Sequence, residues 1–154
     1  ENGKWVRYPV TFYDPEYPIK GAKKFFAGGA GLSSTAKDYA TFLQMYLNGG
    51  ELNGKRILSR TTIQFMMGNQ NSTIWGEISN NYYALAFSVV TQKGQNKGGQ
   101  GSTGTFGWGG YFNSQYFADP KENIIGILMK QTQGAKNDDT GSKFRQLVEQ
   151  AVDD

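Results

Sequence analysis

The sequence predicts an α/β protein of the α+β type, in which an antiparallel sheet of about three strands is flanked by helices. Two kinds of periodicity support this prediction. Apolar residues recur at helical spacing within residues 35–48 and again near the C-terminus, where Phe144, Leu147 and Val148 share one face. Aromatic and β-branched residues gather instead in shorter runs between these helices. The expected strands cover residues 82–91, 111–118 and 124–129.

The first helix is expected over residues 35–48. Thr35 and Asp38 have the spacing of a capping box, which satisfies backbone N–H groups at a helix start. Asn48-Gly49-Gly50 ends the helix with residues that tolerate the left-handed conformation. Between these ends the apolar side chains form one stripe, which predicts a buried face. The stripe consists of Tyr39, Phe42, Leu43, Tyr46 and Leu47.

A short second helix is expected after a tight turn at Asn53-Gly54. Ser59 is placed to cap the N-terminus of this helix. Its apolar residues are Ile63, Met66 and Met67.

The connections between the three expected strands differ, and the last strand needs helices or other chain on both of its faces. Residues 94–110 contain eight glycines, too many for a regular element throughout, and separate the first strand from the second. Residues 119–123 predict a hairpin connection. The run 124–129 is apolar at nearly every position, which predicts a central strand covered on both faces. One terminal helix covers one face, so other helices or absent chain must cover the second.

The N-terminal residues have a different character. Residues 1–31 are rich in Pro, Gly and aromatic side chains, which predicts an irregular segment that wraps over another surface. The chain starts at Glu1-Asn2-Gly3 with neither an initiator Met nor a signal peptide, as expected of a trimmed or processed fragment.

Composition argues against several classes of function. The net charge is only +3 and the basic residues are scattered, apart from Lys20, Lys23 and Lys24, so no nucleic-acid-binding face is expected. Cys and His are both absent, which removes disulfides, thiolate nucleophiles, the usual zinc ligands and every triad based on His. No metal is therefore expected. The sequence has no run of about 18 apolar residues, so no transmembrane segment is predicted. Hydrolysis would need Ser with Lys or Tyr, or a pair of carboxylates.

Two motifs imitate known sites without the context that their chemistry needs. The segment 99–104 matches G-x-G-x-x-G, but no helix start follows it to face a pyrophosphate, so a glycine-rich loop is favoured. Ser34-Thr35-Ala36-Lys37 matches S-x-x-K, the nucleophile and base of penicillin-recognising enzymes. At about 100° per residue, Lys37 projects almost opposite the apolar stripe and faces solvent, where a lysine is a poor base.

The segment 107–112 gives the strongest indication of a site. A glycine pair within a strand weakens it and usually means that something approaches the backbone closely. Trp108 stands beside Gly109 and Gly110 and offers a flat apolar wall. An edge strand with a core Trp explains the same residues equally well, so residue types alone leave both interpretations open.

Several segments occur in a specific order. FAGGAGLSSTAKDY at 26–39 is followed by LNGG at 47–50 and KRIL at 55–58, then by FGWGG at 106–110 and YFADP at 116–120. In this order they resemble the C-terminal part of the serine β-lactamase-related hydrolases, the family of class C β-lactamases, related esterases and D-alanyl-D-alanine carboxypeptidases. The resemblance covers the chain from about Phe26 to Ala151.

The resemblance implies that residues 32–154 are the C-terminal part of an incomplete catalytic domain with the β-lactamase/transpeptidase-like fold. In this family the nucleophilic Ser, its Lys and the Tyr-x-Asn motif lie earlier, so the parent protein is expected to carry them outside this sequence. The implied reaction is acyl transfer through a seryl ester, with no metal or cofactor. A small-molecule ester or amide is the expected substrate, and the missing N-terminal part of the domain is the expected structural partner. The implied location is the bacterial periplasm or cell envelope.

The family's third motif, usually Lys-Thr-Gly or His-x-Gly, matches Trp108-Gly109-Gly110. By this match these three residues contact the substrate, and the backbone N–H of Tyr111 forms half of the oxyanion hole. Trp replaces a cation that helps to bind a substrate carboxylate. The resemblance therefore implies an esterase-like preference for esters or amides without that carboxylate.

Two interpretations from other classes stay open. The glycine- and aromatic-rich loop also suits a non-catalytic binding module that holds a glycan or a peptide. A structural module that folds around an absent partner is the other alternative, and it predicts an exposed sheet edge and self-association.

Overall fold

A computed structural model shows two compact units, Glu1–Thr35 and Ala36–Asp154. Among the residues that it describes, no helix is long and apolar enough to cross a membrane. The described residues are 3–4, 6, 14, 16–21, 24–29, 31–71, 80–98, 100–132 and 138–152.

The first unit contains a short helix, α1 (Tyr17–Lys20), within the segment predicted to be irregular. The hydroxyl of Tyr17 donates a hydrogen bond of 3.0 Å to the carbonyl oxygen of Gly31. Phe25 and Phe26 are exposed. The other aromatic residues of this segment, Trp5, Tyr8, Phe12 and Tyr13, lie outside the described residues, and the wrapping role of residues 1–31 stays a prediction.

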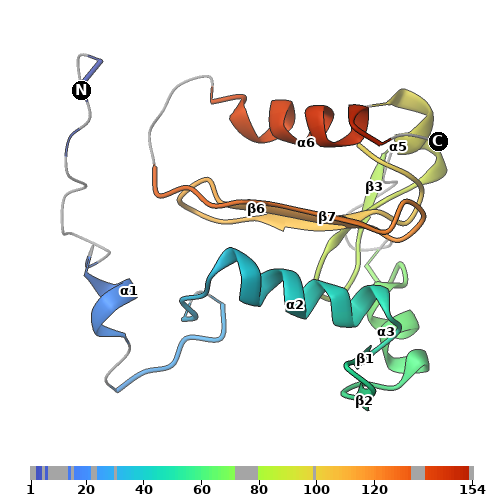
Figure 1. Ribbon diagram of the computed structural model, residues 1–154, viewed down its shortest axis with the longest axis horizontal. Coiled ribbons are helices and arrows are strands. Elements are labelled where there is room, and N and C mark those ends of the chain that lie inside the picture. Colours follow the sequence, from blue (N-terminus) through green and yellow to red (C-terminus); the bar gives the residue numbers. More distant parts are fainter. Residues whose placement is uncertain are drawn as a thin grey trace. The chain divides into compact units, whose positions relative to one another are not determined.

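The second unit is built in three layers (Figure 1). A five-stranded antiparallel sheet of order β3-β4-β5-β6-β7 lies between α2 (Ala36–Leu47) and α6 (Thr140–Gln150). This arrangement agrees with the predicted class of fold. The strands are β3 (Asn81–Tyr83), β4 (Ser88–Val90), β5 (Phe106–Gly109), β6 (Gln115–Asp119) and β7 (Ile124–Leu128).

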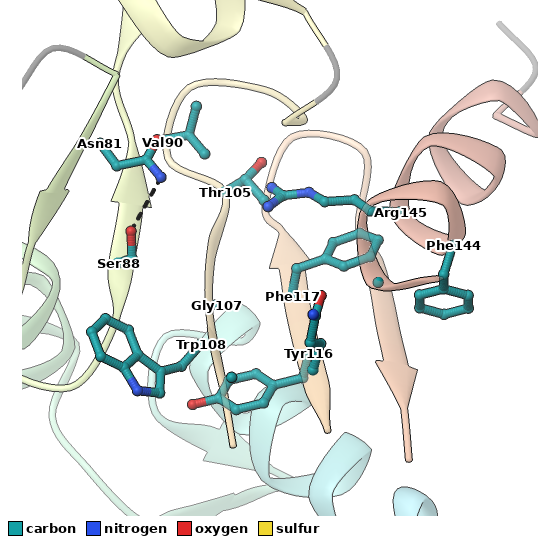
Figure 2. Close-up of a pocket in the computed structure, with 13 residues that line it drawn as sticks. Asn81, Ser88, Val90, Thr105, Gly107, Trp108, Tyr116, Phe117, Phe144 and Arg145 are labelled. Atoms are coloured by element: carbon teal, nitrogen blue, oxygen red, sulfur yellow. Dashed lines mark hydrogen bonds between the residues drawn. The ribbon is translucent and has the colours of Figure 1, made fainter. Parts of the chain in front are cut away.

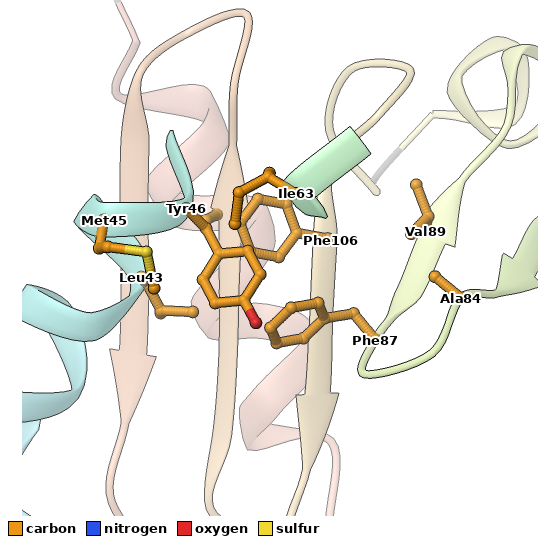
Figure 3. Close-up of a cluster of buried hydrophobic side chains, with 9 residues drawn as sticks. Leu43, Met45, Tyr46, Ile63, Ala84, Phe87, Val89 and Phe106 are labelled. Atoms are coloured by element: carbon orange, nitrogen blue, oxygen red, sulfur yellow. The ribbon is translucent and has the colours of Figure 1, made fainter. Parts of the chain in front are cut away.

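The main core lies between α2 and the sheet (Figure 3). The apolar stripe predicted for α2 is buried at Leu43 and Tyr46, while Phe42 at its margin is 42% exposed. The Tyr46 ring meets that of Phe87 edge to face, with centroids 5.1 Å apart. The buried core residues are Leu43, Met45, Tyr46, Ile63, Ala84, Phe87, Val89, Phe106 and Ala118.

The segment after α2 follows the sequence prediction. Asn53 and Gly54 both adopt positive φ and turn the small hairpin of β1 (Glu51–Leu52) and β2 (Lys55–Arg56). Helix α3 (Arg60–Met67) begins after Ser59, whose hydroxyl accepts a hydrogen bond of 3.0 Å from the backbone N–H of Thr62. The predicted cap is therefore confirmed.

The sheet has more strands than the three that were expected. Residues 82–91 form no single strand, because the chain reverses between β3 and β4. The N–H of Ala84 donates to the carbonyl of Phe87 at 2.8 Å, and the N–H of Leu85 donates to the carbonyl of Met66 at 3.0 Å. The second expected strand, 111–118, begins only at Gln115, because a turn precedes it.

The glycine-rich region holds two regular elements, α5 (Gln92–Lys97) and β5. The sequence did not predict α5, and it indicated β5 only as a strand around the glycine pair beside Trp108. The hydroxyl of Thr91 caps α5 by accepting a hydrogen bond of 3.1 Å from the N–H of Gly94. Gly101 and Gly104 adopt positive φ in the loop between α5 and β5. A strand follows this loop, so the G-x-G-x-x-G match lacks the helix that a nucleotide site requires.

Strand β7 confirms the expected element but not its central position. Among the described strands it pairs only with β6, so it lies at an edge of the sheet. Helices α2 and α6 cover its two faces (Figure 1). The apolar run 124–129 therefore reflects cover on both faces rather than pairing on both edges.

Candidate functional site

Strand β5 is fully paired on one side and only partly paired on the other. Strand β6 pairs with all four of its residues, from Phe106 to Gly109. Strand β4 pairs only with Phe106 and Gly107. From Trp108 onward, the side of β5 that faces away from β6 extends beyond the ladder.

Hydrogen bonds fix the direction of the backbone groups along β5. The carbonyl of Thr105 accepts from the N–H of Val90 at 2.8 Å, toward β4, whereas the N–H of Gly110 donates to the carbonyl of Ser114 at 2.7 Å, toward β6. Successive residues of a strand direct these groups to opposite edges. Gly109 therefore directs its N–H and C=O to the side where the β4 ladder has ended. Such an edge can pair with an extended ligand.

The glycines of this segment are of two kinds. A Cβ at Gly107 would lie 2.3 Å from the carbonyl oxygen of Tyr116, so the contact between β5 and β6 requires glycine there. A Cβ at Gly109 or Gly110 would meet no heavy atom closer than 3.6 Å, an ordinary van der Waals distance. Neither of these two residues has a positive φ. Packing within the described structure therefore does not explain why they are glycines.

Trp108 lies at the open end of β5. Its side chain is 49% exposed, which rules out the interpretation of a core Trp. Its ring meets that of Tyr83 in a T-shaped contact with centroids 5.4 Å apart. Figure 2 shows the indole on the β4 side of its strand, beyond Ser88. Through this contact Tyr83 adjoins the candidate site. No pattern in the sequence indicated this residue, because the signal is a contact between strands.

The glycine-rich loop is fastened to the hairpin between β6 and β7 by Asp119, which is 3% exposed. One carboxylate oxygen accepts from the N–H of Ser102 and the hydroxyl of Thr105, both at 2.8 Å. The other accepts from the N–H groups of Lys121 at 2.9 Å and Glu122 at 3.2 Å. Burial alone would raise the pKa of Asp119, but these four hydrogen bonds outweigh it and lower the pKa. Because Thr105 directly precedes β5, the carboxylate positions the start of that strand.

A cavity of about 300 Å³ lies between the sheet and α6 (Figure 2). The guanidinium of Arg145 lies over the ring of Phe117, 4.8 Å from its centroid. The side-chain oxygen of Asn81 is buried and has no hydrogen-bond partner among the residues that the structure describes. Within the described part of the chain, no cluster of three or more His, Cys, Asp or Glu side chains is placed to bind a metal ion. The cavity is lined by Asn81, Ser88, Gly107, Gly109, Phe117 and Arg145, among others.

Tyr111, Ser34 and Lys37 are the other residues that the sequence singled out. Tyr111 stands in the turn after β5, is 54% exposed and packs its ring edge-on against Phe112, with centroids 5.1 Å apart. The hydroxyl of Ser34 donates to the carbonyl of Thr35 at 3.3 Å. Lys37 is exposed on α2, as its position on the helix predicted. Within the described part of the chain, neither Ser34 nor Lys37 has a contact that indicates catalysis.

Comparison with known proteins shows what the chain is similar to. The Beta-lactamase family profile matches residues 2–150. Two curated relatives from strains of Mycobacterium tuberculosis, "Uncharacterized protein MT1414" and "Protein Rv1367c", are each 30% identical over 120 residues. The alignment covers 70% of this chain but only 29% of each relative.

A solved structure shares the fold. It is EstCE1, described as a hydrolase with promiscuous acyltransferase activity, and it matches with a TM-score of 0.65 at 21% identity. The match covers 95% of this chain and 39% of EstCE1. From the family match over nearly its whole length, together with this fold, the chain belongs to the beta-lactamase family, the serine β-lactamase-related hydrolases.

Proposed function

We propose that the chain is the C-terminal part of a serine hydrolase that transfers acyl groups through a seryl ester, with β5 lining the substrate site. The observation that carries this proposal is the open end of β5. Its edge extends past the β4 ladder, and packing against the described residues does not require glycine at Gly109 or Gly110. Glycines along an open edge let another group approach the backbone closely.

The proposed roles follow from this position. The acyl group lies along Gly109 and Gly110, and the Trp108 ring forms the adjoining wall. The backbone N–H of Tyr111 donates one hydrogen bond to the developing oxyanion, a contact that is worth about 10²–10³ in rate in other enzymes. Trp108 supplies no cation for a substrate carboxylate, so neutral esters or amides are the proposed substrates. The esterase-like character also agrees with the acyltransferase activity in the description of EstCE1.

The nucleophile is proposed to lie outside this chain. The chain spans 29% of the length of its curated relatives and 39% of EstCE1, which leaves room for the catalytic Ser and Lys elsewhere. The absent part of the domain would also meet the edge of β7, which pairs with no other described strand than β6. By family membership, we propose a location in the bacterial periplasm or cell envelope.

A fluorophosphonate probe followed by intact-mass spectrometry tests whether the nucleophilic serine lies outside this chain. We expect no adduct on this chain and one stoichiometric adduct on a serine of the complete protein outside it. An adduct on Ser34 of this chain would show that the S-x-x-K match is the nucleophile after all. No adduct on either protein would refute the serine hydrolase.

Substrate preference is tested on the complete protein with p-nitrophenyl acetate and a cephalosporin that carries the usual carboxylate. We expect the ester to have the larger kcat/KM. Faster turnover of the cephalosporin would contradict the role proposed for Trp108.

A further inference from the structure

A pair of aromatic rings stands beside the open end of β5. Tyr83 of β3 and Trp108 of β5 meet with centroids 5.4 Å apart and an interplanar angle of 71°. Their side chains nevertheless stay 42% and 49% exposed. Two large rings that touch each other and still face solvent form a surface patch rather than a part of the core.

The two rings start from opposite faces of the sheet. Tyr83 pairs with Ser88, and Ser88 pairs with Gly107, so these three residues share one row and one face. Trp108 follows Gly107 and starts from the other face, because successive side chains of a strand alternate. The β4 ladder ends here, and the Trp108 indole extends toward the β4 side (Figure 2). The rings therefore meet where the edge of β5 becomes open.

The chemistry of this place favours an uncharged aromatic ligand. The described residues that adjoin the ring contact in the strand register, namely Tyr83, Ser88, Gly107, Trp108 and Gly109, carry no charge. A further ring can pack against the pair in an offset or edge-to-face arrangement. Compared with a saturated group of similar size, such packing improves binding about twofold to tenfold.

We propose that Tyr83 and Trp108 form an aromatic subsite that selects acyl groups carrying an uncharged aromatic ring. The subsite rests on the function proposed above, because the acyl group is taken to lie along Gly109 and Gly110. Tyr83 is its specificity-determining residue, since its ring completes the surface that Trp108 begins. An acyl group bound along Gly109 then places its ring against both side chains.

The test compares two esters on the complete protein. p-Nitrophenyl phenylacetate and p-nitrophenyl cyclohexylacetate share a leaving group and have similar size, and differ in the aromaticity of the acyl ring. We expect the ratio of their kcat/KM values to fall about fivefold in Tyr83→Leu and to be retained in Tyr83→Phe. Phe65→Leu, which removes a 60% exposed ring from α3, is the control and should leave the ratio unchanged. An unchanged ratio in an active Tyr83→Leu variant would overturn the subsite.

A binding measurement separates the subsite from the catalytic proposal. The indole N–H signal of Trp108, assigned with Trp108→Phe, is followed while N-methylphenylacetamide or N-methylcyclohexylacetamide is added. We expect the aromatic amide to shift it at lower concentration, and Tyr83→Leu to abolish the difference. This result in a protein that neither hydrolyses esters nor reacts with the fluorophosphonate would uphold the subsite and refute the proposed reaction. Ester hydrolysis together with equal responses to both amides would refute the subsite and leave the proposed reaction standing.

Discussion

A methyl group added at Gly107 and one added at Gly109 should have opposite effects, although both residues lie on β5. At Gly107 the new carbon would lie 2.3 Å from the carbonyl oxygen of Tyr116 and 3.1 Å from the Cα of Phe117. Both obstacles are backbone atoms, so a strand has to move, and we expect Gly107→Ala to cost about 2–3 kcal/mol of stability. At Gly109 the nearest atoms are 3.6 and 3.9 Å away. There Ala fits, and the loss of glycine freedom in the unfolded chain should stabilise by about 0.4–1 kcal/mol.

Activity should follow a different order from stability. In the complete protein, Gly109→Ala places a methyl group beside the edge along which the acyl group is proposed to lie. A displacement of the substrate by about 1 Å can lower the rate about 10²-fold, so we expect a fall in kcat/KM of about 10- to 10²-fold. Urea denaturation gives the stability of each variant, and the hydrolysis of p-nitrophenyl acetate gives kcat/KM.

The pair of measurements can refute the reasoning in two ways. If Gly109→Ala is destabilised as much as Gly107→Ala, then Gly109 is required by packing and its place in the site loses its support. If Gly109→Ala is as stable as the parent protein and equally active, the substrate does not lie along this part of β5.

Three further variants test separate parts of the structure. Asp119→Asn should cost about 1–3 kcal/mol at pH 7, because an amide cannot accept all the hydrogen bonds of the buried carboxylate. Since the folded pKa of Asp119 is lowered, its contribution is present above the unfolded pKa of about 3.9 and is lost as the pH falls through the folded value. Urea midpoints of the two proteins should therefore converge in acid, and a constant difference would show that the charge plays no part. Ser59→Ala should lower the free energy of unfolding by about 0.5–2 kcal/mol in the same assay, and Ser59→Asp should restore it. Equal stability of all three proteins would mean that the cap of α3 does not contribute to stability. Trp108→Lys should raise kcat/KM for a carboxylate-bearing ester relative to a neutral one about tenfold, and an unchanged ratio would mean that this position does not face the substrate.

Helices α2, α3 and α6 of the second unit could be predicted because their signals are local. The apolar stripe of α2 and the hydroxyl of Ser59 lie within one or two helical turns of the positions that they determine. The hairpin of β3 and β4 was missed for the opposite reason. Its turn has no Gly, Pro or Asn, and the N–H of Leu85 bonds to the carbonyl of Met66, a residue that no local pattern connects with it.

Helix α5 and the bounds of β5 were missed because glycine lowers the propensity for both kinds of regular structure. In α5, Gly94 is required by a long-range contact, since a Cβ there would lie 2.3 Å from the carbonyl oxygen of Asn80. In β5, Gly107 is required by Tyr116 of the neighbouring strand. The motif at Trp108 singled out this segment of the sequence, but only the register showed that the β4 ladder ends beside it.

The same register indicates what this chain contributes to the proposed reaction. The contacts that hold β5 include four residue pairs with β6 and the Asp119 carboxylate bound to Thr105, and all of them lie within Ala36–Asp154. A wall fixed in this way need not rearrange when charge develops on the substrate, and preorganised donors owe their effect to this property. The two parts of the protein are therefore proposed to have different roles in the reaction. This chain would supply a rigid wall with an open edge, and the segment outside it would supply the groups that form and break bonds.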